Sequence, residues 1–341
     1  MPKLGVTMPG LNQPIDAFPT MARTAEDAGF DSVWNYEFHR NPFVVHALTA
    51  KATSRITLGT GLAAAAGRSP FEMANAAADV DEVSHGRTAL GMSMGAFGWS
   101  ELLNGVDVSH PASRMREYIE LLHRVWDWTA GIEVGSYEGR FYRFSEPQFN
   151  PFGQRPLARP HIPIYLGALR PTMARLGGQI ADGVLGYFMP PQYIRDVILP
   201  NVAVGARKVG RDPQDVDVAS ETVCSVSEDR AEAYRRARLQ VGIYIAAELS
   251  APMADHMGKT KERLMCVEAL MTRGPMGLID VVDDDLVDTF SITGTPDECR
   301  RKLKEFDDCL PHVILHPPYM PVLSTEESAD AFNNIVQAFG R

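Results

Sequence analysis

The strongest constraint on the fold is a regular alternation of short apolar runs with segments of helical periodicity. Apolar runs of strand length lie near residues 4, 32, 57, 90, 164, 185, 220 and 314. Helical spacing follows most of them, as at Phe18, Met21 and Ala25. Strands that alternate with helices build a parallel sheet covered by helices. Eight such units predict a TIM (β/α)8 barrel. The structural alternative is a doubly wound open sheet, but no GxGxxG motif follows the first strand.

The chain has 341 residues, a length that a single α/β barrel commonly reaches. We therefore expect one TIM-barrel domain over residues 1–341, with two insertions. Residues 131–161 contain VGSYEGRFYRF, which predicts a hairpin turning at Glu138-Gly139. Residues 229–293 contain at least two helical patterns, which we expect to cover the barrel mouth.

Composition excludes several classes of function. A net charge of −10 argues against nucleic acid or an anionic membrane as a partner. No stretch approaches 18 consecutive apolar residues, and the amino end lacks a signal-peptide pattern. The four cysteines form no CxxC pair, so we expect reduced thiols and a cytoplasmic location. The nine histidines include no HExxH motif, so no metal site is predicted.

The segment IPIYLGALRPTMARLGGQIADGV, residues 162–184, combines a strand, a tight turn and a helix. Pro171 suits the first helical position, so the helix would direct unpaired backbone N–H groups and its positive dipole end at the turn. Such a helix end is suited to a phosphate, and Arg170 adds a formal charge. We predict an anion site at Gly167, Ala168, Leu169, Arg170 and Pro171. The alternative is an ordinary strand–helix unit with a surface arginine.

This segment resembles the cofactor-phosphate segment of the bacterial luciferase-like oxidoreductases, which use either flavin mononucleotide (FMN) or the deazaflavin coenzyme F420. Three further stretches, AEDAGFDSVWNYE, GTG…RSP and ALGMSMGAFGWSE, resemble the same family in the same order. Together the matches cover nearly the whole chain. The resemblance implies a TIM barrel, a flavin-type cofactor at the barrel mouth and a small organic substrate. It also implies a homodimer, since relatives usually pair.

The resemblance also implies particular residues at strand ends. Glu37 matches the acidic position that contacts the cofactor or substrate in relatives. A histidine usually follows it directly, but here Phe38 intervenes before His39. We predict Glu37 and His39 as the polar partners of the reaction. In relatives that use the deazaflavin, a non-prolyl cis peptide after the third strand backs the ring, and by position it falls at Gly61-Leu62. The predicted ring support is Gly61, Leu62, Ala63 and Ala64.

Four residues near other strand ends are predicted substrate contacts, because active sites of TIM barrels lie at the carboxyl ends of the strands. Phe97 and Trp99 suit an apolar pocket wall, whereas His316 and Tyr319 follow the last strand and are candidate proton donors. Some relatives that act on sugar phosphates carry a glutamate after the last glycine of the fourth strand. Here Ala96 occupies that position, so we do not expect that activity.

Three functions follow from these observations. The first is hydride transfer between coenzyme F420 and an unidentified organic substrate, favoured by GTGL and its small neighbours, which are nearer to the F420 branch. The alternative is an FMN-dependent monooxygenase that uses molecular oxygen and a partner reductase. A third possibility is a non-catalytic flavin-binding relative, suggested by the displaced His39 and the absent glutamate. The sequence indicates neither the substrate nor the direction of hydride transfer, because substrate-selecting loops vary most in a barrel.

Overall fold

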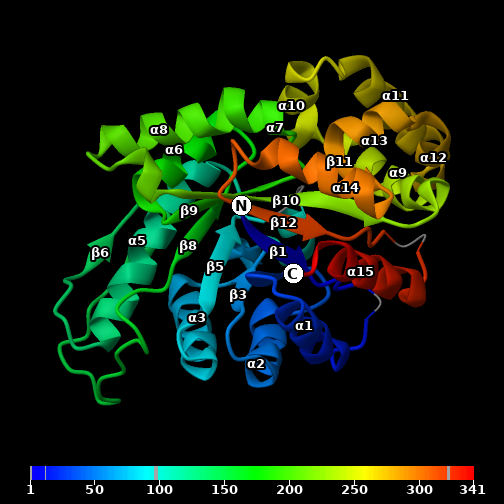
Figure 1. The fold of residues 1–341 in the computed structure, drawn as a ribbon. Coiled ribbons are helices and arrows are strands. Elements are labelled where there is room, and N and C mark those ends of the chain that lie inside the picture. Colours follow the sequence, from blue (N-terminus) through cyan, green and yellow to red (C-terminus); the bar gives the residue numbers. More distant parts are fainter. Residues whose placement is uncertain (1, 12, 96–98, 321–322) are drawn as a thin grey trace.

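Eight parallel strands close into a barrel in the computed structural model, which describes residues 2–11, 13–95, 99–320 and 323–341 (Figure 1). In order around the barrel they are β1 (Lys3–Thr7), β2 (Ser32–Asn35), β3 (Thr57–Thr60), β5 (Thr88–Ser93), β8 (Ile164–Gly167), β9 (Gly183–Tyr187), β10 (Asp217–Val226) and β12 (His312–His316). The barrel closes where β12 pairs with β1, in the register Lys3↔His312. The predicted TIM barrel is therefore confirmed.

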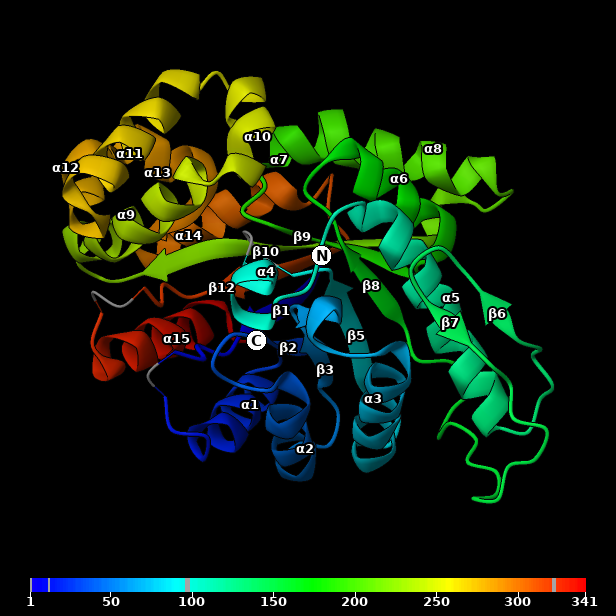
Figure 2. The same ribbon diagram turned by 180° about the vertical axis from the view of Figure 1, so that it is seen from behind.

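Helices follow the strands and form the outer layer. They include α1 (Ala17–Asp27), α2 (Pro42–Ala52), α3 (Pro70–Ser84), α5 (Pro111–Thr129), α6 (Pro171–Ile180), α8 (Leu199–Lys208), α14 (Pro296–Leu303) and α15 (Thr325–Phe339). Figure 2 shows α1, α2 and α3 side by side along one flank. Among the described residues, no helix is long and apolar enough to cross a membrane.

Capping side chains fix where several helices begin. The Glu72 N–H donates to Ser69 Oγ at 3.1 Å at the start of α3. Thr295 and Glu298 form a capping box at the start of α14. Such caps satisfy backbone N–H groups that the first helical turn leaves unpaired. By contrast, α6 begins at Pro171 without a side-chain cap.

The helical segment that follows β9 contains an irregularity. It divides into α7 (Pro191–Tyr193), a π-helical turn η2 (Ile194–Ile198) and α8. Pro200 explains the irregularity, because proline lacks a backbone N–H and its ring clashes with the carbonyl four residues earlier. The wider π turn accommodates that clash without ending the helix.

Alternate residues of the strands fill the barrel interior in layers. The middle layer is apolar and includes the fully buried Trp34, with Tyr165, Leu185 and Ile314. A Cβ added at Gly59 would lie 2.3 Å from the Trp34 indole, so this glycine leaves room for the ring. Below it, Ser32 Oγ lies 2.8 Å from His312 Nε2 at the amino-terminal ends of the strands.

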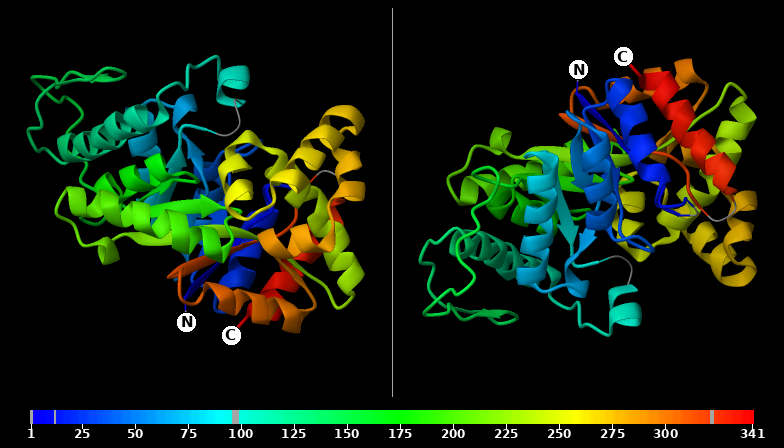
Figure 3. Two further views of the ribbon diagram at one scale, coloured as in Figure 1. Left: turned by 90° about the horizontal axis from the view of Figure 1, so that it is seen from above. Right: turned by 90° about the horizontal axis from the view of Figure 1, so that it is seen from below.

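The two long intervals lie on opposite sides of the barrel (Figure 3). The first contains a two-stranded hairpin of β6 (Tyr137–Glu138) and β7 (Arg143–Phe144). The second contains α9 (Arg230–Ala246), η4 (Glu248–Ser250), α10 (Ala251–His256), α11 (Thr260–Arg273), α12 (Leu278–Val281) and α13 (Asp284–Phe290). It ends in a strand that the sequence analysis did not predict, β11 (Ser291–Gly294), which pairs with the last residues of β10.

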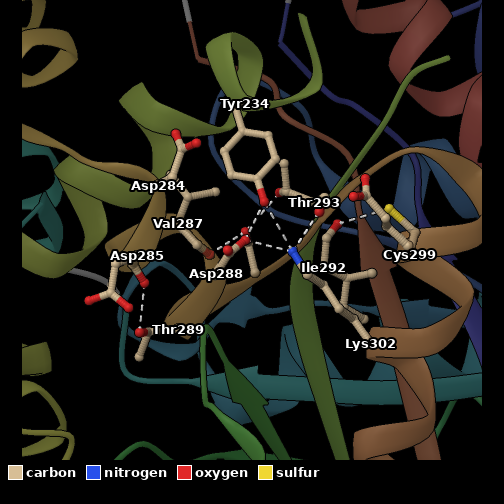
Figure 4. Close-up of polar contacts among 12 residues, drawn as sticks. Tyr234, Asp284, Asp285, Val287, Asp288, Thr289, Ile292, Thr293, Cys299 and Lys302 are labelled. Carbon is tan, nitrogen blue, oxygen red and sulfur yellow. Dashed lines mark hydrogen bonds and ion pairs between the residues drawn. The ribbon is translucent and has the colours of Figure 1, made fainter. Parts of the chain in front are cut away.

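Figure 4 shows how β11 is anchored. The Lys302 ammonium of α14 donates to Asp288 Oδ1 and to the Thr293 carbonyl, both at 2.6 Å. The Tyr234 hydroxyl of α9 donates to the same carboxylate. These contacts join α9, α13, β11 and α14, so the second insertion is attached to the barrel through the long strand β10.

Candidate active site

The top layer of the barrel interior is polar, unlike the layer beneath it. It is formed at the carboxyl ends of the strands by Thr7, Tyr36, Gly61, Gly167, Tyr187, Glu221 and His316. Each lies two residues beyond an inward-facing residue of the middle layer, such as Trp34 before Tyr36 and Ile314 before His316. In TIM barrels this end carries the active site.

An acid–imidazole pair lies in this layer. His316 Nδ1 is 3.0 Å from Glu221 Oε2, and the two residues are only 2% and 3% exposed. An ionised carboxylate only accepts hydrogen bonds, so Nδ1 donates its proton and Nε2 carries the lone pair. Neither His316 Nε2 nor Glu221 Oε1 has a hydrogen-bond partner within the described part of the chain, although both atoms are buried. Buried polar atoms without partners are costly, and they mark a place where a ligand can supply them.

Aromatic side chains hold the imidazole of His316 in place. Tyr36 stacks on it at 5.7 Å between centroids, and Tyr187 meets it edge-on at 5.2 Å. Tyr319 lies 5.1 Å away. Burial raises the pKa of all three phenols, so these rings stay neutral near neutral pH. Gln240 of α9 joins two of them, donating to the Tyr187 hydroxyl at 2.8 Å and accepting from the Tyr319 N–H at 2.9 Å.

The predicted ring-support segment borders this pair. The peptide bond Gly61-Leu62 is cis, as the resemblance implied. A Cβ at Gly61 would lie 2.2 Å from Glu221 Oε1, and one at Gly167 would lie 2.6 Å from Leu62 Cδ1. The structure thus brings Gly61, Leu62 and Gly167 together with Glu221, although they come from distant parts of the sequence.

Glu37 also contacts the ring-support segment, through the backbone of Ala64. Its Oε2 accepts hydrogen bonds from the Ala64 N–H at 2.8 Å and from Arg68 Nη1 at 2.6 Å. Ala63 and Ala64 form the short strand β4, which pairs with β5. The carboxylate of Glu37 therefore orders the loop after β3. His39 is exposed and packs edge-on against Phe38, outside the top layer.

The predicted anion site lies at the start of α6. The Ala168 N–H donates to Leu185 O at 3.0 Å, and Leu169 O accepts from the Tyr193 hydroxyl at 2.9 Å. Arg170 donates to the carbonyls of Glu248 at 2.6 Å and Leu249 at 3.4 Å. Its guanidinium is therefore already engaged, and the uncapped first turn of α6 is the remaining anion-binding feature.

Of the four predicted substrate contacts, two join the site. His316 lies in the top layer, and Tyr319 packs beside it. Phe97 lies outside the described residues. Trp99 is the first residue of α4 (Trp99–Asn104), which follows β5.

Sequence reasoning missed Glu221, Tyr36, Tyr187 and Gln240. One signal was available for Glu221, which is a carboxylate in the middle of the strand pattern VDVASETVCSV. A carboxylate is rarely buried unless it has a partner and a function. Tyr36 and Tyr187 follow the period of two from inward-facing Trp34 and Leu185, but that period is visible only when the strand ends are known.

Comparisons with known proteins agree with this architecture. The family model for luciferase-like monooxygenases matches residues 3–312. The 5,10-methylenetetrahydromethanopterin reductase of Methanolobus tindarius is 30% identical over 301 residues, covering 87% of this chain and 88% of the relative. The chain therefore belongs to the luciferase-like monooxygenase family, and the resemblance noted in the sequence is confirmed.

Solved structures show the same fold. The coenzyme F420-dependent tetrahydromethanopterin reductase of Methanopyrus kandleri superimposes with a TM-score of 0.82 at 24% identity, covering 99% of this chain and 98% of that one. An F420-dependent secondary alcohol dehydrogenase, solved with an F420–acetone adduct, gives a TM-score of 0.76 at 17% identity, covering 99% of both chains.

Proposed function

We propose that this protein is an oxidoreductase that uses coenzyme F420 to move a hydride to or from a small organic substrate. The observation that carries the proposal is the pair of buried, unpartnered atoms, Glu221 Oε1 and His316 Nε2, beside the glycine-lined segment at the barrel mouth. The family membership and the named activities of similar proteins support F420 as the cofactor.

The residues present fit such a group. Gly61 and Leu62 would lie against the deazaflavin ring, and the small side chains of Ala63 and Ala64 would leave space beside it. The first turn of α6, together with Gly167, Ala168 and Leu169, would hold the phosphate. When bound, the deazaflavin accepts or donates a hydride, and the protein orients it and excludes water.

Glu37 and Arg68 have a supporting role in this proposal. Their ion pair and the Ala64 contact hold the loop that meets the ring. His39, which is exposed, would act only on the rim of the site. His316 would exchange a proton with the substrate.

The proposal extends to assembly. Val44 of α2 and Phe71 of α3 are each 50% exposed, and these helices pack together on the outer surface. Exposed apolar side chains on neighbouring helices fit a homodimer contact. Light scattering on the purified protein would give twice the chain mass of 37.5 kDa.

The test is a fluorescence titration of the protein with oxidised F420 and, separately, with FMN. Micromolar binding of F420 with weak binding of FMN is the expected result. The reverse preference would instead favour an oxygen-using monooxygenase that needs a partner reductase. Tight binding of F420 without reduction by any hydride donor would point to a non-catalytic relative.

A further inference from the structure

We infer that Gly10 and Leu11 form a flap over the barrel mouth, that the Tyr36 hydroxyl latches this flap, and that the flap is the gate through which a cofactor enters and leaves. The latch is a property of the folded chain and goes beyond the proposed function. Only the part of the inference that concerns F420 rests on that function.

The first argument is that the site is closed in this structure. His316 and Glu221 are both buried, and so are the two atoms, His316 Nε2 and Glu221 Oε1, that lack a hydrogen-bond partner among the described residues. Tyr319, which packs beside His316, is buried as well. A ligand can contact these two atoms only after part of the cover moves away. The question is which part of the cover that is.

The second argument is the set of contacts at the Tyr36 side chain. Its hydroxyl oxygen accepts hydrogen bonds from the Gly10 N–H at 2.9 Å and from the Leu11 N–H at 3.1 Å. A Cβ added at Gly10 would lie 3.3 Å from Tyr36 Cζ, so the backbone of the loop packs directly on the ring. The same ring stacks on the His316 imidazole at 5.7 Å between centroids. One side chain therefore connects the loop after β1 to the buried site.

The third argument is how the loop is held on either side of these contacts. Before the flap, the Met8 N–H donates to the Trp34 carbonyl at 2.9 Å, which continues the pairing of β1 with β2. After the flap, the Gln13 side-chain amide donates to the Thr325 carbonyl at 2.8 Å. The flap thus lies between two fixed points, so it can open as a short unit once the contacts with the Tyr36 hydroxyl break.

The helix α9 also covers the top layer, but it is held by a much larger interface. Gln240 of α9 donates to the Tyr187 hydroxyl and accepts from the Tyr319 N–H. The helix has 17 residues and packs against β10 and β11, and its Tyr234 hydroxyl donates to Asp288 of α13. Moving α9 would disrupt close-packed side chains, whereas moving the flap breaks two hydrogen bonds. The flap is therefore the part of the cover that opens first.

Hydrogen–deuterium exchange on the protein without cofactor tests the latch. Tyr36→Phe keeps the ring and its stacking on His316, but it leaves the N–H groups of Gly10 and Leu11 without their acceptor. We expect exchange of these two amides to accelerate by about tenfold or more. Equal exchange rates in the wild type and the variant would overturn the latch.

The matched control is Tyr234→Phe, which also removes one hydroxyl from a buried tyrosine. That hydroxyl donates to Asp288 near the start of α9 and makes no contact with the flap. Exchange at Gly10 and Leu11 should therefore stay at the wild-type rate in this variant. If Tyr234→Phe accelerates it as much as Tyr36→Phe does, the effect is a general loss of stability and the latch is wrong.

Stopped-flow fluorescence with oxidised F420 tests the gate. A gate must open for entry and for exit, so Tyr36→Phe should raise the association and dissociation rate constants together, each by about fivefold or more, with Kd within about threefold of the wild type. Loss of a direct contact with the ligand would instead raise the dissociation rate constant alone. That outcome would make Tyr36 a binding residue and overturn the gate.

Two further outcomes separate this inference from the proposed function. If amide exchange accelerates in Tyr36→Phe while both rate constants for F420 stay unchanged, the flap opens but the cofactor enters by another route, so the gate is wrong and the cofactor assignment stands. If F420 binds to neither protein, the proposed function fails together with the gate for F420, and the exchange experiment still decides whether the latch exists.

Discussion

At the scale of single residues, the site depends on close contacts at two glycines. Gly61 allows the Glu221 carboxylate to lie against the backbone, and Gly167 does the same for the Leu62 side chain. Neither glycine has a positive φ, so their requirement is space and not backbone conformation. A methyl group added at either glycine would therefore displace the side chain that packs against it.

Gly61→Ala should therefore disturb the site directly. The new Cβ would lie 2.2 Å from Glu221 Oε1, so the carboxylate must move away from His316. We expect F420 affinity to fall by about tenfold or more, which is about 1.4 kcal/mol. Gly67→Ala is the control, because its nearest atom would be 3.8 Å away. Equal F420 dissociation constants for the two variants would contradict this account.

Glu37→Gln separates a supporting role from a catalytic one. The amide can still accept from the Ala64 N–H, but the ion pair with Arg68 is lost. We expect the dissociation constant of F420 to rise by a few-fold while kcat of the saturated enzyme stays within about twofold, because a loop contact acts on binding. A drop in kcat of about a hundredfold would instead make Glu37 a general acid or base.

At the scale of elements, the start of α6 brings backbone N–H groups and a dipole to the anion site, while Arg170 is bound to carbonyls of the second insertion. The helix was predictable from Pro171 and its apolar spacing. The partners of Arg170 were not, since Glu248 and Leu249 lie nearly 80 residues away in the sequence.

Arg170→Met tests how this element binds phosphate. We expect the protein to bind F420 more tightly than the phosphate-free deazariboflavin, by about tenfold or more. In the variant that ratio should persist within about threefold, since helix N–H groups supply the binding. Dissociation constants of F420 and of deazariboflavin, measured for the wild type and the variant, give this ratio. Collapse of the ratio to about one would show that the guanidinium itself holds the phosphate.

At the scale of the whole molecule, the barrel was predictable and parts of the site were not. Eight apolar runs alternating with helices specify the barrel because strands buried on both faces need continuous apolar residues. The strand β11 has only four residues, SITG, and pairs with an extension of β10 that sequence periodicity cannot distinguish from the barrel portion. The Glu221–His316 pair joins residues 95 positions apart, and the pairing of the neighbouring strands β10 and β12 brings them together.

Acid stability should reflect two histidines buried outside the site. Burial lowers the pKa of His46 and of His312 from 6.5 to about 4. Between pH 6.5 and pH 4 the unfolded chain therefore binds protons that the folded chain excludes, so the free energy of unfolding falls as pH falls. Each group contributes on the order of 3 kcal/mol, which is fully present above pH 6.5.

Calorimetric Tm values between pH 4 and pH 7 check this expectation. Tm should decline below pH 6.5, and the decline should be shallower in His46→Gln, whose side chain can still donate to the Gly59 carbonyl that His46 Nε2 contacts at 2.9 Å. His39→Gln, a change at an exposed residue, is the control and should follow the wild type. If Tm of His46→Gln falls with pH as steeply as Tm of the wild type, the loss of stability in acid arises from groups other than His46.

The most direct measurement of the central claim is a crystal structure of the protein with oxidised F420. We predict density for the deazaflavin ring against Gly61 and Leu62, within reach of His316 Nε2, and the phosphate at the first turn of α6. A ring bound elsewhere, or a phosphate that avoids α6, would contradict the assignment of the barrel mouth as the F420 site.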